Sequence, residues 1–263
     1  MPPYPFSAAD LQALRTARQL LENPGLAARV SNLLGAPIER GLRALPADWN
    51  TRIDTIARAA LTRAADAALF TLKDDPGAAP SRLWHKLGAV TSGGVGGFFG
   101  LAALAVELPV STTLMLRSIA DIARSEGESV TRLDTKAACL EVFALGGRSG
   151  DDDGTESAYF AVRAALGKTV SDAAQFVATH HVAAEGAPVM IQLITRVAKR
   201  FGADVTSKAA AQAVPAIGAV GGAAINLAFI DHFQGMARGH FIIRRLERHY
   251  GAEAVRRAYL DIG

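Results

Sequence analysis

The sequence predicts an all-α protein, a multi-helix bundle built around two glycine-rich apolar helical hairpin segments. Apolar residues recur at helical spacing through most of the 263 residues. No stretch alternates apolar and polar residues as a half-buried strand does. Two uncharged stretches, residues 87–106 and 209–230, carry repeated glycines at a spacing typical of close helix contacts.

The composition limits the class of protein. Half of the residues are apolar, 20% are charged, and the mean hydropathy is +0.18. The chain is therefore too apolar to be disordered, and part of its apolar surface needs an explanation. The net charge of +3 is spread along the chain, which argues against a nucleic-acid partner and indicates mild attraction to anionic surfaces. Cys139 is the only cysteine, so neither an intramolecular disulfide nor a cysteine zinc site is expected.

The first half of the chain shows helix starts and stops. Ser7, with Asp10 three residues later, predicts a helix start, and turn residues predict its end at Glu22. A longer helix is expected over residues 51–72. The uncharged stretch 87–106 is about as long as a membrane span. Pro109 is expected to bend the chain into a hairpin, as the first residue of a helix over 109–125. Another helix is expected over 131–144.

The second half repeats this design. Helices are expected over residues 157–201, with breaks at Gly167 and around 186–188, before the second uncharged stretch. A basic segment follows, and four of its arginines are predicted to lie at a membrane surface: Arg238, Arg244, Arg245 and Arg248. We expect residues 1–78 to form a helical region that packs on a core of residues 79–263, as one compact unit.

The repeated glycines predict helix contacts. Gly88, Gly96 and Gly100 lie at multiples of four residues, and Gly218 and Gly222 repeat the pattern. Rows of small residues let two helix backbones approach closely, in membrane helix pairs and in tightly packed soluble bundles alike. The spacing alone leaves both interpretations open.

Polar residues near the uncharged stretches form a candidate cluster. Arg117 and Asp121 are one helical turn apart, because side chains four residues apart share a helix face. The other candidate members are Glu107, Tyr159, Arg163, Asn226, Asp231 and His232. Packing of the two stretches would bring these groups together, either as a network that fixes helix register or as a site for a ligand or a proton. The spacing of histidines and carboxylates predicts no metal site, and no phosphate-binding loop indicates a cofactor.

Several strings together resemble one protein family. They are residues 107–109, 117–123, 139–143, 159–163, 214–218, Asn226 and 244–248. Over roughly residues 80 to 251 the chain is similar to the EcsC family, which is named for a gene beside an ABC transporter. The resemblance implies a bacterial helical protein, cytoplasmic or membrane-associated, with no settled biochemical activity. It supplies no catalytic residues.

Three functions remain open from the sequence. The first is a membrane-associated accessory protein of unknown activity, cytoplasmic because the N-terminus lacks a secretory signal, and held peripherally at the inner membrane by lipid or by a membrane protein such as a transport system. The second is a helical protein that binds an apolar, lipid-like ligand. The third is an enzyme that uses the buried Glu, Arg and Asp cluster. The sequence does not predict the oligomeric state.

Overall fold

The computed structural model of the chain describes residues 6–22, 26, 39–69, 101–145, 158–180, 188–213 and 218–262, and all regular structure within these ranges is helical. The prediction of an all-α fold is thus confirmed. The elements are α1 (Ala8–Leu21), α3 (Glu39–Arg43), α4 (Trp49–Leu69), α6 (Leu101–Ser125), α7 (Leu133–Glu141), the 3₁₀ turn η1 (Val142–Ala144), α8 (Ala158–His180), α9 (Pro188–Gln212), α10 (Gly218–Tyr250) and α11 (Ala252–Asp261).

Helix α1 begins where the capping residues predict. The Ser7 hydroxyl accepts a hydrogen bond from the backbone N–H of Asp10 at 3.1 Å and donates one to the Asp10 carboxylate at 2.8 Å. The backbone N–H of Ser7 donates to the Tyr250 hydroxyl at 3.3 Å. One end of α1 is therefore capped locally and also tied to the end of α10.

Helix α6 differs from the prediction at Pro109. The helix runs through this residue without a turn, so the prediction of a hairpin bend with a helix start at Pro109 is wrong. Proline removes one backbone hydrogen bond from a helix interior. Leu104 and Leu108, in the turn before Pro109, are both fully buried. Their packing compensates for the lost bond, and local propensity does not decide the conformation here.

Helix α8 likewise runs through Gly167, so the break predicted there is wrong. Glycine costs about 1 kcal/mol against alanine inside a helix. Val162 and Leu166 on the same helix are buried, and this burial outweighs that cost. The other predicted break is followed by a helix start, because α9 begins at Pro188.

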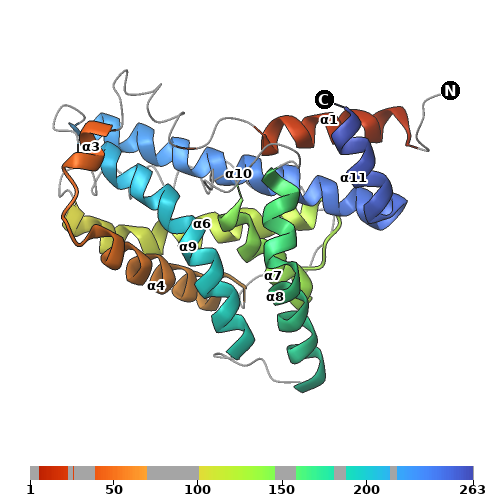
Figure 1. Cartoon of the computed structure of the whole chain (residues 1–263), viewed down its shortest axis with the longest axis horizontal. Helices are drawn as coiled ribbons and strands as arrows, with labels where there is room; N and C mark the ends of the chain where they lie inside the picture. The colour runs from red at the N-terminus through yellow and green to blue at the C-terminus, as the bar shows by residue number, and fades with distance from the viewer. Residues whose placement is uncertain are drawn as a thin grey trace.

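The long helix α10 organises the molecule (Figure 1). Helix α1 packs along its C-terminal half, α6 lies on another side, and α11 folds back against its end. Helix α4 packs on both α6 and α9. Where α9 and α10 meet η1, aromatic rings fill the core with centroids 5.0 to 6.1 Å apart: Phe143, Phe201, Phe229 and Phe233.

Helix α1 approaches α10 closely at Gly239, whereas at Gly235 the contact is an ordinary van der Waals one. A Cβ atom at Gly239 would lie 2.6 Å from Cγ of Leu21, and one at Gly235 would lie 3.7 Å from Cδ2 of Leu20. These glycines are four residues apart, the spacing that the sequence suggested for contact surfaces. The contacts predicted for Gly88, Gly96 and Gly100 lie outside the described residues, as do the surroundings of Gly218 and Gly222.

A helix needs about 20 consecutive, predominantly apolar residues to cross a bilayer. Within the ranges given above, no helix is both long enough and apolar enough to cross one. Most of the first uncharged stretch, residues 87–100, lies outside these ranges.

Candidate functional site

A buried ion pair joins three helices at the centre of the bundle. Nζ of Lys208, on α9, lies 2.6 Å from Oε1 of Glu107 on α6. The same Nζ donates to Oδ1 of Asn226, on α10, at 2.8 Å. The ring of Phe229 lies 4.9 Å from the ammonium group. Lys208 is completely buried, and every polar contact it makes stays within the bundle.

Burial lowers the pKa of Lys208, while the charge of Glu107 and its hydrogen bond act in the opposite direction. The structure thus brings together Glu107 and Asn226, two members of the predicted cluster, through a lysine that the sequence analysis did not single out. Lys208 directly precedes the uncharged stretch 209–230. A charge at the boundary of an apolar stretch needs a partner when it is buried, and this position is the feature of the sequence that indicates Lys208 as a member of the cluster.

The contacts that the structure gives for the other members of the predicted cluster differ from residue to residue. Asp121 is buried, and its Oδ1 lies 2.8 Å from Nη2 of Arg124 on the same helix. Arg117 is half-buried, with Nη2 3.5 Å from the carbonyl oxygen of Ala67 on α4. The His232 ring is buried against Phe233, with 5.0 Å between ring centroids, and Asp231 beside it is half-buried.

Tyr159 belongs to a second polar group, which contains two further residues absent from the sequence-based cluster. Its hydroxyl lies 3.1 Å from Nδ1 of His240, and Nε2 of the same imidazole lies 3.9 Å from Oε2 of Glu141. Burial lowers the pKa of His240 well below its usual value, an effect that the charges of Arg163 and Arg244 reinforce. The imidazole is therefore neutral at pH 7. Burial also raises the pKa of Glu141 to about 7, against the opposing charges of the same two arginines.

Arg163 lies beside this group and forms a two-pronged ion pair with Glu247. The distances from Nη1 and Nη2 to the two carboxylate oxygens are 2.7 and 3.0 Å. Paired geometry of this kind is the strongest form of an arginine–carboxylate contact. Glu141, Arg163 and Glu247 all line an open pocket of about 830 Å³. In this pocket the buried carboxyl group of Glu141 and the Arg163–Glu247 ion pair border open space.

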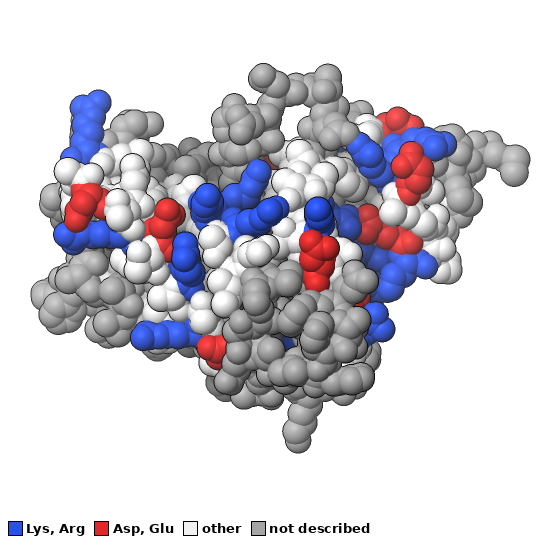
Figure 2. All heavy atoms as spheres, turned by 60° about the horizontal axis from the view of Figure 1, so that its bottom comes forward, with Lys and Arg blue, Asp and Glu red and all other residues white. Residues whose placement is uncertain are grey.

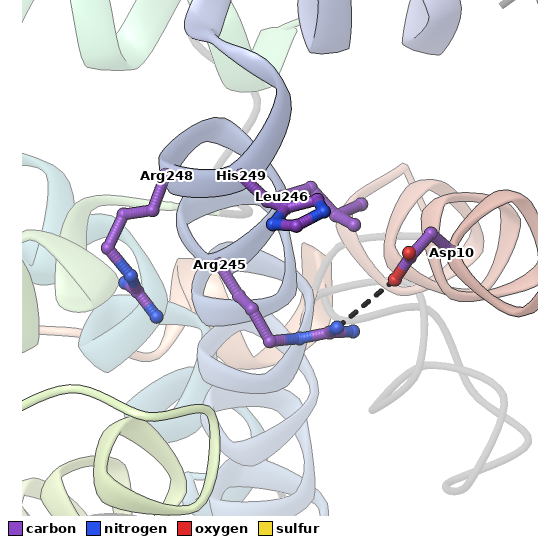
Figure 3. Close-up of a pocket in the computed structure, with 5 residues that line it drawn as sticks. All are labelled: Asp10, Arg245, Leu246, Arg248 and His249. Carbon is purple, nitrogen blue, oxygen red and sulfur yellow. Dashed lines mark hydrogen bonds and ion pairs between the residues drawn. The ribbon is translucent and has the colours of Figure 1, made fainter. Parts of the chain in front are cut away.

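Three of the four arginines predicted to lie at a membrane surface take part in internal ion pairs. Arg244 donates to Glu128 at 2.8 Å, and Arg248 pairs with the same carboxylate. Arg245 bridges Glu126 at 2.9 Å and Asp10 at 3.2 Å. Figure 3 shows Arg245 extending toward Asp10 of α1, while Arg248 points away on another side of α10.

Glu128 carries most of this network. Burial alone would raise the pKa of Glu128, but hydrogen bonds from Arg244 and Thr135 and the charges of Arg244 and Arg248 lower it below its usual value. Arg238, the fourth predicted residue, is exposed. The acidic partners could not be assigned from the sequence, because they lie more than 100 residues from the arginines, as the separation of 116 between Glu128 and Arg244 shows.

Fold and site define an all-α bundle in which one buried ion pair and its hydrogen bond to Asn226 link α6, α9 and α10, and in which an open polar pocket lies between α7, α8, α10 and α11. The family model described as the EcsC protein family matches residues 28–246. The chain therefore belongs to the EcsC family, over a longer part of its length than the resemblance had suggested. No curated protein and no solved structure matches it.

Proposed function

We propose that this protein acts at a membrane surface, as a peripheral accessory protein of the bacterial inner membrane or of a membrane transport system. Binding is reversible and combines attraction of surface cations to anionic lipid headgroups with shallow contact of apolar residues. The proposal rests on the surface formed by α4 and α9, which pack side by side.

That surface carries exposed cations on both helices. Arg58 and Arg63 lie on α4, and Arg196 and Lys199 lie on α9. Among the described residues, Arg58, Arg63 and Lys199 form no ion pair, and Arg196 contacts only the carbonyl oxygen of Ala165, at 3.5 Å. Figure 2 shows Lys and Arg side chains spread across the lower face of the molecule, with some Asp and Glu between them.

Helix α9 also carries an exposed apolar side chain. Ile191, near the start of α9, is 51% exposed and is among the most exposed large apolar side chains described. The internal pairing of Arg244, Arg245 and Arg248 moves the expected contact surface away from the C-terminal arginines. Each cation near an anionic membrane contributes about 1 kcal/mol, so four of them give a measurable but reversible attraction.

The test is co-sedimentation with vesicles that contain anionic lipid, and with neutral vesicles, at low and high salt. The variant changes Arg58, Arg63, Arg196 and Lys199 to glutamine. The control changes the same number of exposed arginines elsewhere: Arg15, Arg132, Arg238 and Arg257. We expect the variant to lose at least tenfold in binding to anionic vesicles, and the control to lose much less. Equal losses, or no binding by the unmodified protein, would contradict the proposal.

A further inference from the structure

The open pocket of about 830 Å³ lies where α7, α8, α10 and α11 meet. Its lining combines four carboxyl groups, of which Glu141 is buried, with three guanidinium groups and apolar side chains. The residues that matter for the argument are Glu141, Phe160, Arg163, Val170, Arg244 and Arg256. They come from four helices, so the pocket is a product of the tertiary fold.

Glu141 is a carboxyl group with unused hydrogen-bonding capacity. Its side chain is 6% exposed, and its Oε2 lies 3.9 Å from Nε2 of His240. That distance is too long for a hydrogen bond. Among the described residues, no group donates a hydrogen bond to Glu141, and Nε2 of His240 has no hydrogen-bond partner either. Glu141 borders the open pocket, so a ligand bound there can supply a donor to its carboxyl group.

The guanidinium groups offer the opposite chemistry. Arg163 uses Nη1 and Nη2 on Glu247, and Arg244 uses Nε and Nη2 on Glu128. Each guanidinium has five N–H donors, so both arginines keep donors beyond these contacts. Arg256 adds a third guanidinium from α11, and Phe160 and Val170 add apolar surface. The pocket therefore complements a molecule with a donor cation at one end and an anion at the other.

We propose that this pocket binds a small zwitterion with a primary ammonium group and a phosphodiester group. The ammonium group donates hydrogen bonds to Glu141, and the phosphodiester oxygens accept from the arginines at the rim. This chemistry is shared by a free soluble compound and by an ethanolamine phospholipid headgroup. The proposal concerns a different part of the molecule from the α4 and α9 surface and does not depend on membrane binding.

Proton release gives the proposal a second readout. Burial raises the pKa of Glu141 to about 7. A bound ammonium group favours the ionised carboxylate, so binding near pH 7 releases protons, and affinity rises from pH 6 to pH 8. The charged and titratable groups around Glu141 are Asp134 on α7, Tyr159 and Arg163 on α8, His240, Arg244 and Glu247 on α10, and Glu253 and Arg256 on α11.

The first experiment is calorimetric titration of the full chain with glycerophosphoethanolamine and with glycerophosphocholine. The two probes have the same anion, but the quaternary ammonium of the second has no N–H donor. We expect the first to bind at least tenfold more tightly, and to release protons at pH 7. No binding of the first probe, or equal affinity for both, would overturn the proposal.

The second experiment compares Glu141→Gln with Glu253→Gln. Both residues line the pocket, but the Glu253 side chain is 76% exposed and pairs with Arg257. We expect Glu141→Gln to weaken binding of glycerophosphoethanolamine at least tenfold and to abolish proton release, and Glu253→Gln to change affinity by about twofold or less. Wild-type affinity in Glu141→Gln would overturn the proposal. If Glu141→Gln does not fold, the comparison of the two probes on the unmodified protein tests the proposal.

A final arm identifies the source of the ligand. Vesicles of phosphatidylcholine with and without phosphatidylethanolamine are compared, with the soluble probe as competitor. If the protein binds the vesicles with phosphatidylethanolamine more tightly, and if the soluble probe competes this binding away, the ligand is a lipid headgroup. Binding of the soluble probe alone indicates a free compound. Either result supports the pocket, and neither requires the anionic surface of α4 and α9.

Discussion

Lys208 and Glu107 form an ion pair inside the bundle, with 2.6 Å between Nζ and Oε1 and side-chain exposures of 0% and 5%. Asn226 completes the set from a third helix. A charge that is buried this completely loses its hydration and is stabilised only by its partners in the protein. The pair therefore fixes how α6, α9 and α10 fit together, more than it adds to stability.

This relationship predicts an asymmetric double-mutant cycle. Lys208→Met should lower the free energy of unfolding by about 3 to 5 kcal/mol, because it leaves the Glu107 carboxylate buried without its cation. The double variant Glu107→Met with Lys208→Met should recover most of this loss. Urea unfolding of the four proteins measures the coupling, and additive effects of the two substitutions would contradict the prediction.

The pairing of the C-terminal arginines predicts that charge reversal there damages the fold. Arg244→Glu should lower the free energy of unfolding by roughly 1 to 3 kcal/mol, because Glu128, to which Arg244 donates at 2.8 Å, is buried. The matched control is Arg238→Glu on the same helix, at an exposed position with no ion pair to any described residue. Thermal unfolding compares the two, and equal melting temperatures would count against the assigned role of Arg244.

Asp204 predicts a dependence of stability on pH. Burial raises the pKa of this carboxyl group from its usual 3.8 to about 8. Between these values the folded protein holds a proton that the unfolded chain releases, so this group makes stability fall as pH rises from about 4 to about 8. Asp204→Asn keeps the side chain neutral at every pH.

The variant should therefore gain stability relative to the unmodified protein as pH rises. The gain between pH 5 and pH 8.5 should be on the order of a few kcal/mol. Glu141 and His240 titrate in both proteins, so the difference between the two isolates Asp204. Urea unfolding at the two pH values measures it, and a constant difference would show that Asp204 is ionised in the folded protein.

Two glycines inside helices should respond oppositely to alanine. A Cβ atom at Gly239 would lie 2.6 Å from Cγ of Leu21 and 3.0 Å from the carbonyl oxygen of Ala17. Gly239→Ala should thus cost about 1 to 3 kcal/mol by forcing α1 away from α10. At Gly167 nothing lies within 4 Å of such an atom. Gly167→Ala should stabilise the protein by roughly 0.5 to 1 kcal/mol, because alanine favours the helix. Thermal unfolding distinguishes the two, and stabilisation by both would show that α1 does not pack closely here.

The sequence predicted what local interactions determine. The start of α1 depends on Ser7 and Asp10, three residues apart, and it was found correctly. The continuity of α6 through Pro109 and of α8 through Gly167 was missed, because burial of neighbouring side chains against other helices outweighs local propensity. A glycine that a close helix contact does require is Gly239, which lies outside the two uncharged stretches.

The polar groups were predictable as residue types but not as pairs. Glu107 and Asn226 were recognised from charge and polarity in apolar surroundings, yet their common partner Lys208 lies 101 residues from Glu107. The acidic partners of Arg244, Arg245 and Arg248 were missed for the same reason. Such pairs depend on how the helices are arranged, and one sequence carries no direct record of that arrangement.

The bond between Ser7 and Tyr250 spans 243 residues, and Tyr250 also donates to Asp10 at 2.8 Å. During synthesis, α1 leaves the ribosome long before the helix that it packs on. At about 5 to 20 residues per second, this delay is roughly 10 to 50 seconds. Until then Leu14, Ala17 and Leu21, which are buried in the folded protein, have no surface to cover them. The apolar face of α1 therefore stays without its partner helix until α10, more than 200 residues further along the chain, has been synthesised.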